Sequence, residues 1–218
     1  PTYKLVASPA EINILETKTP KAEHTSNNGH VRVLDLCAGA GGWNVAAARC
    51  GWTVVLSVDK CSSVQKYHAI NFGSPFIKGD LLNPQDVELI CSSVPTGLEC
   101  ILASPPCQAF SSCGLHKPGD PRAQVAVACT RIACILKPLV FIIENTRSFC
   151  TSKANPVWNT TIRPMLHAAG FKITVVKSCL SRLGIHLQGS EFSVAPPDTS
   201  RLQTCPWFTN GADANTNG

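Results

Sequence analysis

Short apolar runs alternate with longer stretches of mixed polarity through most of the chain. Runs rich in Val, Ile and Leu are typical of strands that are buried on both faces of a sheet. They occupy residues 31–36, 53–58, 75–80, 99–104 and 138–144. Stretches with helical character follow them at 43–51, 61–73, 83–94, 122–136 and 157–170, and two further strands are expected at 171–180 and 191–196.

Strands that alternate with helices predict an α/β fold with a doubly wound, mostly parallel sheet. The last two strands are expected to form a C-terminal antiparallel pair. In such sheets ligands bind outside the carboxyl ends of the strands, so the residues that follow each strand are the first candidates for a functional site.

Both ends of the chain lack this pattern. Residues 1–30, which include "KTPKAEHTSNNGH", are interpreted as a flexible N-terminal extension, and residues 201–218 as a polar tail. The chain has 218 residues, enough for one domain with a substantial core, and we place that domain at 31–200.

Composition narrows the class of protein only modestly. Hydrophobic residues make up 44% of the chain and charged residues 15%, as expected for a globular protein, and the formal net charge of +5 favours polyanionic partners weakly. The twelve cysteines include no CxxC pair and no Cys/His spacing suited to zinc, so no metal site is expected. Reduced cysteines in an intracellular protein, cytosolic or nuclear, are the favoured interpretation. Neither a membrane span nor a signal peptide is evident.

Glycines and carboxylates follow the first three predicted strands. Asp35 ends the first strand and leads into "CAGAGGW", where Gly39, Gly41 and Gly42 permit a tight turn and close approach to a ligand. Asn44 stands where a dinucleotide fingerprint has its last glycine, which favours a different nucleoside cofactor over NAD. Asp59 ends the second strand at a separation typical of an acid that binds ribose hydroxyls, and Asp80 follows the third.

A thiol and a carboxylate follow the fourth and fifth strands. Pro105 and Pro106 stiffen the loop before Cys107 and place its thiol at the ligand-binding edge. Glu144 ends the apolar run "FIIE", where burial would raise its pKa toward neutrality.

These segments resemble the cytosine-C5 DNA methyltransferases. "DLCAGAGGW" is similar to the family's glycine motif for S-adenosylmethionine (AdoMet), "SPPCQAFS" to its catalytic Pro-Cys-Gln motif, and "FIIENT" to its Glu-Asn motif. Their order and spacing agree, weaker matches lie at Asp59, Asp80 and "IRPMLHAAGFKI", and the resemblance covers roughly residues 31–194. It implies a Rossmann-like AdoMet-dependent methyltransferase fold.

The resemblance also implies a role for each motif residue. Cys107 would be the nucleophile that adds to the cytosine ring, and Glu144 would hydrogen-bond and protonate the ring nitrogen of a base flipped out of duplex DNA. Gln108 and Asn145 complete these two motifs, and Arg122 would contact substrate or phosphate from the loop that closes over the base. The residues implied to bind AdoMet are Asp35, Cys37, Ala38, Gly39, Ala40, Gly41, Gly42, Asp59, Lys60, Asp80, Leu81 and Pro106.

The match breaks near the C-terminus. The family has a Gln-x-Arg-x-Arg motif, but here Gly189 and Glu191 fall at the arginine positions, with Arg182 nearby. The family's target-recognition domain is also expected to be absent from this chain.

Three functions therefore stay open. The leading one is methylation of cytosine in DNA by an incomplete or impaired enzyme. The alternatives are cytosine methylation in tRNA and a non-catalytic module that binds AdoMet or a partner. Oligomeric state is not predicted, and a nuclear location is expected only for a eukaryotic source.

Overall fold

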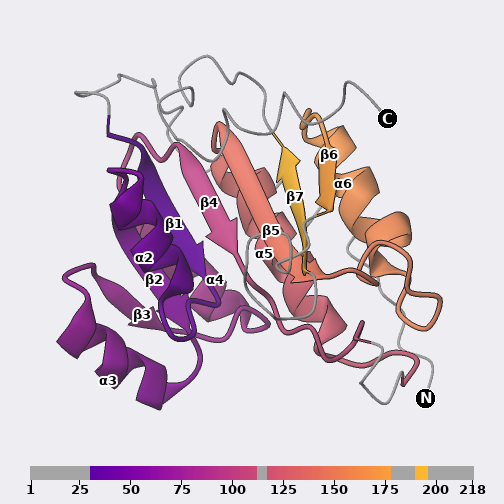
Figure 1. Cartoon of the computed structure of the whole chain (residues 1–218), viewed down its shortest axis with the longest axis horizontal. Helices are drawn as coiled ribbons and strands as arrows, with labels where there is room; N and C mark the ends of the chain where they lie inside the picture. The colour runs from indigo at the N-terminus through magenta and orange to yellow at the C-terminus, as the bar shows by residue number, and fades with distance from the viewer. Residues whose placement is uncertain (1–29, 112–116, 178–189, 196–218) are drawn as a thin grey trace, which may run out of the picture.

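The computed structural model describes residues 30–111, 117–177 and 190–195, and these form a single seven-stranded sheet with helices on both faces (Figure 1). The strands are β1 (Arg32–Leu36), β2 (Thr53–Asp59), β3 (Phe76–Lys78), β4 (Cys100–Ala103), β5 (Val140–Thr146), β6 (Thr174–Lys177) and β7 (Ser190–Ala195). Their order across the sheet is β3-β2-β1-β4-β5-β7-β6.

The first five strands are parallel, which confirms the predicted α/β class and the mostly parallel sheet. β7 runs antiparallel to both β5 and β6, and in Figure 1 its arrow points opposite to that of β4. The carboxyl ends of β1, β4 and β5 consequently share one edge of the sheet (Figure 1).

The helices are α2 (Gly42–Arg49), α3 (Ser62–Asn71), α4 (Pro84–Ser93), α5 (Ala123–Leu136) and α6 (Arg163–Ala168), with a π-helical turn, η1, at Trp158–Ile162. Sequence signals set several of their ends. Asn83 accepts a hydrogen bond from the Gln85 amide (2.9 Å) and Pro84 occupies the first turn of α4, as its Asn-Pro start predicts. Gly51 adopts φ +70° just beyond α2.

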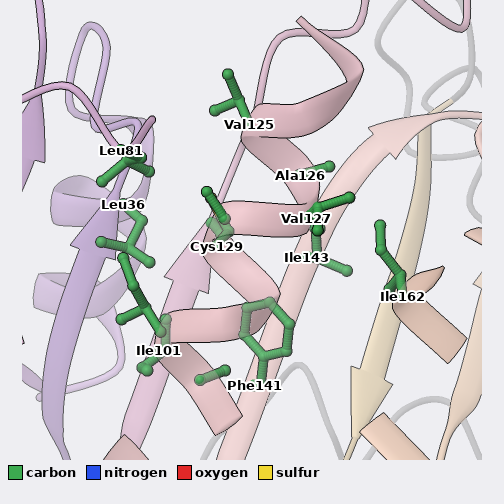
Figure 2. Packing of buried hydrophobic residues seen from close by; sticks show 14 of the residues in the cluster. Leu36, Leu81, Ile101, Val125, Ala126, Val127, Cys129, Phe141, Ile143 and Ile162 are labelled. Carbon is green, nitrogen blue, oxygen red and sulfur yellow. The ribbon is translucent and has the colours of Figure 1, made fainter. Parts of the chain in front are cut away.

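Alternating residues of the strands build two apolar layers. Ile101, Phe141 and Ile143 face α5 in the larger layer, where Figure 2 shows them around Cys129 of that helix. Leu102 and Ile142 face the opposite way, into a smaller cluster that Trp43 of α2 helps to cover. Side chains on β4 and β5 therefore alternate between an α5 face and an α2 face.

One strand extends beyond its predicted end, and one helical stretch is divided. β5 extends through Asn145 and Thr146, because β7 pairs with it there; Glu144 therefore lies inside the strand and not directly after it. The helical stretch at 157–170, which Pro164 is expected to interrupt, divides into η1 and α6, with Pro164 in the first turn of α6. Pro164 lacks an amide hydrogen, so a continuous α-helical ladder cannot pass through it.

The expected N-terminal extension up to residue 29 and the tail at 201–218 lie outside the described residues.

Candidate functional site

The loop after β1 is a tight turn at the carboxyl edge of the sheet. Cys37, Gly39 and Gly41 have φ of +59°, +49° and +82°. The Ala38 amide donates to the Val58 carbonyl of β2 (3.0 Å), which fixes the loop to the neighbouring strand. A methyl group on Gly41 would lie 2.2 Å from the Phe72 ring, so only glycine fits at this position. Gly42 then begins α2, and Ala40 between the two turn glycines is exposed.

Asp59 is held against this loop by two backbone amides. Its Oδ2 accepts from the Gly39 amide (3.0 Å) and its Oδ1 from the Cys61 amide (2.9 Å). Each carboxylate oxygen retains a further lone pair for a ligand hydroxyl. Lys60, beside it, is exposed at the start of α3.

Asp35 is a buried acid beneath the glycine loop. Asn44 donates to its Oδ2 (2.8 Å), whereas its Oδ1 has no hydrogen-bond partner within the described part of the chain. Burial raises the pKa of Asp35 to about 7, and repulsion from Asp59 adds to the rise. A cationic donor such as the ammonium group of AdoMet would satisfy the orphaned oxygen and stabilise its charge, so the residues present fit that cofactor.

Asp80 and Leu81 lie just beyond β3. The Asp80 amide donates to Asp86 (2.8 Å) and its Oδ1 accepts from the Leu82 amide (3.0 Å), so the turn into α4 is fixed. Leu81 packs into the larger apolar cluster near Leu36, as Figure 2 shows.

The Pro-Pro-Cys segment is anchored to β5 by a side chain. Asn145, which is 1% exposed, donates from Nδ2 to the Pro105 carbonyl (3.0 Å), while its Oδ1 accepts from the Thr146 amide (2.9 Å). The Cys107 carbonyl accepts from the amides of Phe110 and Ser111 (both 2.9 Å), which closes a turn. Cys107 and Pro106 are half-buried, and Gln108 is exposed.

Glu144 is half-buried on the α2 face of β5. Burial raises the pKa of its carboxyl, and a hydrogen bond from Ser104 opposes the rise. Trp43 Nε1 donates to the Ser104 hydroxyl (2.7 Å).

Arg122 is paired with Asp120 through a multi-point contact. Arg122 Nε lies 3.0 and 3.2 Å from the two carboxylate oxygens, and Nη2 lies 2.6 Å from Oδ2. These bonds lower the pKa of Asp120 to about 2 and raise the pKa of Arg122, to which the charge of Cys107 also contributes. The Arg122 side chain is 47% exposed, so it is held at the site and open to a ligand.

The structure thus brings the predicted residues of β1, β2, β4 and β5 to one edge, as the sequence indicates. Sequence reasoning assigned no role to Trp43, Ser104 or Asp120, and it noted Asn44 only as the replacement of a glycine. Asn155 was also missed; it donates to the carbonyls of Ala109 (2.8 Å) and Lys117 (3.2 Å) and joins the two sides of the segment 112–116. A buried polar residue inside an apolar helix, as at Asn44, is the one signal that could have been used.

Residues 112–116, Arg182 and Gly189 lie outside the described residues. Glu191 is placed by its backbone alone, opposite Asn145 in the ladder between β5 and β7. Across the described ranges no group of three or more His, Cys, Asp or Glu side chains could hold a metal ion, and no helix is long and apolar enough to cross a membrane.

Comparison with known proteins identifies a family and relatives of this chain. Residues 31–181 match the family described as C-5 cytosine-specific DNA methylase. Type II methyltransferases M.HgiDI and M.HgiGI of Herpetosiphon aurantiacus are 32% and 31% identical over 124 residues. Each alignment covers 56% of this chain, with 39% of M.HgiDI and 96% of M.HgiGI.

A solved structure gives the same relationship. It belongs to a proposed DNA modification methyltransferase encoded within an E. coli prophage, and it aligns with a TM-score of 0.60 and 26% identity. The alignment covers 76% of this chain and 46% of that one. The chain therefore spans less than half the length of M.HgiDI and of this solved protein, and nearly all of M.HgiGI.

Proposed function

This chain belongs to the C-5 cytosine-specific DNA methylase family, and we propose that it transfers a methyl group from AdoMet to carbon 5 of cytosine in DNA. The observation that carries the proposal is the bond from Asn145 Nδ2 to the Pro105 carbonyl (3.0 Å). It joins the segment that carries the candidate nucleophile to the strand that carries the candidate acid, which supports a single site for Cys107 and Glu144 at this edge of the sheet.

The chemistry assigned to Cys107 begins with its thiolate. Cytosine carbon 5 is a poor nucleophile, and addition of the thiolate to carbon 6 makes it electron-rich. The carbon–sulfur bond forms as the ring's double-bond electrons shift toward nitrogen 3 and carbon 5.

Glu144 would stabilise the ring charge that develops during this addition. Burial raises the pKa of its carboxyl, which keeps a larger fraction protonated near neutral pH than in an exposed glutamate. A protonated carboxyl can donate to nitrogen 3 of the base. Loss of the carbon-5 proton and cleavage of the carbon–sulfur bond later restore the aromatic ring and the free thiol.

Bound AdoMet would supply an electrophilic methyl group next to carbon 5. The residues proposed to hold it come from the first three strand ends: Asp35 toward the ammonium group, the Gly39–Gly42 turn along the methionine portion, Asp59 at the ribose and Asp80 at the adenine amine. The orphaned Oδ1 of Asp35 and the lone pairs left on Asp59 support this assignment. The exposed Lys60 would lie beside the adenine.

The remaining expectations stay predictions. These are a domain at 31–200, the flipped base as the form of the substrate, and a nuclear location in a eukaryotic source. The relatives named above are bacterial or phage-encoded, and they give the nuclear location no support.

Covalent trapping tests the proposal. A duplex oligonucleotide that contains 5-fluorocytosine is incubated with the chain and AdoMet, and adducts are resolved by denaturing electrophoresis and mass spectrometry. We expect an adduct through Cys107 that Cys107→Ser abolishes, with AdoMet binding retained in calorimetry. Cys91→Ser, a matched change of a half-buried thiol on α4, should leave the adduct intact.

Two other results would each select an alternative. AdoMet binding without any adduct would favour the non-catalytic module. Labelled methyl transfer to tRNA, with none to DNA, would overturn the DNA assignment and keep the chemistry.

A further inference from the structure

Three polar side chains, those of Trp43, Ser104 and Glu144, are linked by hydrogen bonds at the edge of the sheet. Trp43 Nε1 donates to the Ser104 hydroxyl (2.7 Å), and the Ser104 side chain hydrogen-bonds Glu144. The groups come from α2, from the end of β4 and from β5, and 61 residues separate Trp43 from Ser104.

Strand alternation explains why these side chains meet. Leu102 and Ile142 point to the α2 face, so Ser104 and Glu144, each two residues further along, continue on that face. β4 and β5 are paired in register at Ala103 and Ile143, which places Ser104 and Glu144 next to one another.

The direction of the chain of hydrogen bonds follows from the donors available. An indole nitrogen can only donate, so Trp43 occupies a lone pair of the Ser104 oxygen. The single hydroxyl proton of Ser104 then points to the remaining acceptor, Glu144. One oxygen of the Glu144 carboxyl is thereby engaged as an acceptor, and the proton of the acid form is placed on the other oxygen.

We propose that Trp43 and Ser104 are positioning residues that hold one oxygen of Glu144 and direct the protonated oxygen toward the substrate base. This inference rests on the function proposed for Glu144 and gives a role to two residues, Trp43 and Ser104, to which the sequence motifs assign none. Trp43 directly follows the Gly41–Gly42 turn, so the pair also ties the loop proposed for AdoMet to the acid.

The test follows the titration of Glu144 itself. The 218-residue chain is labelled with ¹³C at the glutamate side-chain carboxyl carbons, and the Glu144 resonance is assigned by its loss in Glu144→Gln. Ser104→Ala removes the bond that lowers the pKa, so the resonance should titrate at higher pH. Trp43→Phe should shift it in the same direction, because Ser104 is then free to rotate. Ser104→Thr, which keeps the hydroxyl, should restore the original titration.

Matched substitutions control for general effects of the changes. Ser92→Ala removes an exposed hydroxyl on α4, and Trp52→Phe trims a second indole that packs on the same apolar cluster as Trp43. Neither should move the Glu144 titration. In the trapping assay, Ser104→Ala should slow adduct formation by about tenfold, which corresponds to about 1.4 kcal/mol, the upper end for loss of one uncharged hydrogen bond.

The outcomes separate this inference from the function on which it rests. An unchanged Glu144 titration in Ser104→Ala overturns the inference, and a shift in Ser104→Ala without one in Trp43→Phe removes Trp43 from it. Absence of any adduct in the unsubstituted chain refutes the proposed catalysis, whereas the NMR titration still decides whether the three groups are coupled.

Discussion

Replacing Asp35 by Asn should remove a specific pH dependence of stability. The Asp35 carboxyl is fully buried, and its pKa rises from 3.8 to about 7, mainly through burial. The folded chain therefore holds this proton more tightly than the unfolded chain, so stability is lost as the pH rises from about 4 to about 7. At about 1.4 kcal/mol for each pKa unit, the whole rise corresponds to about 4 kcal/mol, of which about 3 kcal/mol falls between pH 5 and pH 8.

Urea unfolding of the unsubstituted chain and of Asp35→Asn at a series of pH values measures how much Asp35 contributes to the pH dependence of stability. Asparagine keeps the shape of the side chain and an oxygen that can accept from Asn44, but it has no charge to desolvate. The free energy of unfolding of the variant, relative to the unsubstituted chain, should therefore increase by about 3 kcal/mol from pH 5 to pH 8. Histidines and the other acids titrate in both proteins, so their contributions to the pH dependence cancel when the two free energies of unfolding are subtracted. If the difference in free energy of unfolding between the two proteins does not change with pH, the raised pKa of Asp35 is refuted.

Three further changes test other parts of the site. Gly41→Ala should destabilise the fold by about 1–3 kcal/mol in urea unfolding, because φ is +82° and Cβ would overlap a ring, whereas Gly73→Ala, in open space, should cost far less. Asn145→Ala should lower stability by about 1–3 kcal/mol, because it leaves a carbonyl of the Pro-Pro-Cys segment without its partner; no loss would show that this bond is dispensable. Arg122→Ala should slow trapping by 5-fluorocytosine and leave AdoMet affinity unchanged in calorimetry, with exposed Arg131→Ala as the control; equal rates for the two would remove Arg122 from the site.

The apolar pattern predicted the fold because buried parallel strands have a sequence pattern that is visible within each strand itself. Runs such as "VRVLDL" are short and apolar, and their length and regular spacing distinguish them from the longer helical stretches between them. Because the carboxyl ends of parallel strands lie at one edge of a sheet, the sequence pattern alone groups Asp35, Asp59, Cys107 and Glu144.

Contacts between distant residues could not be read in the same way. β5 continues past Glu144 because β7, some 45 residues later in the chain, supplies the partner for Asn145. The bond from Trp43 to Ser104 likewise depends on how α2 packs over β4, and no local pattern encodes it. Asn44 attracted notice as a missing glycine, while its structural role is to donate to the buried Asp35.

The two faces of the sheet explain why Glu144 precedes Asn145 and not the reverse. Neighbouring residues of a strand point to opposite faces, so Glu144 and Asn145 cannot serve the same partner. Glu144 shares the α2 face with Ser104, and Asn145 points to the α5 face, where it binds the Pro105 carbonyl. Ser104 and Pro105 repeat the same alternation at the end of β4, so two adjacent dipeptides make two cross-strand links. One link adjusts the proposed acid and the other fixes the segment of the proposed nucleophile, and exchanging the residues of either pair would break both.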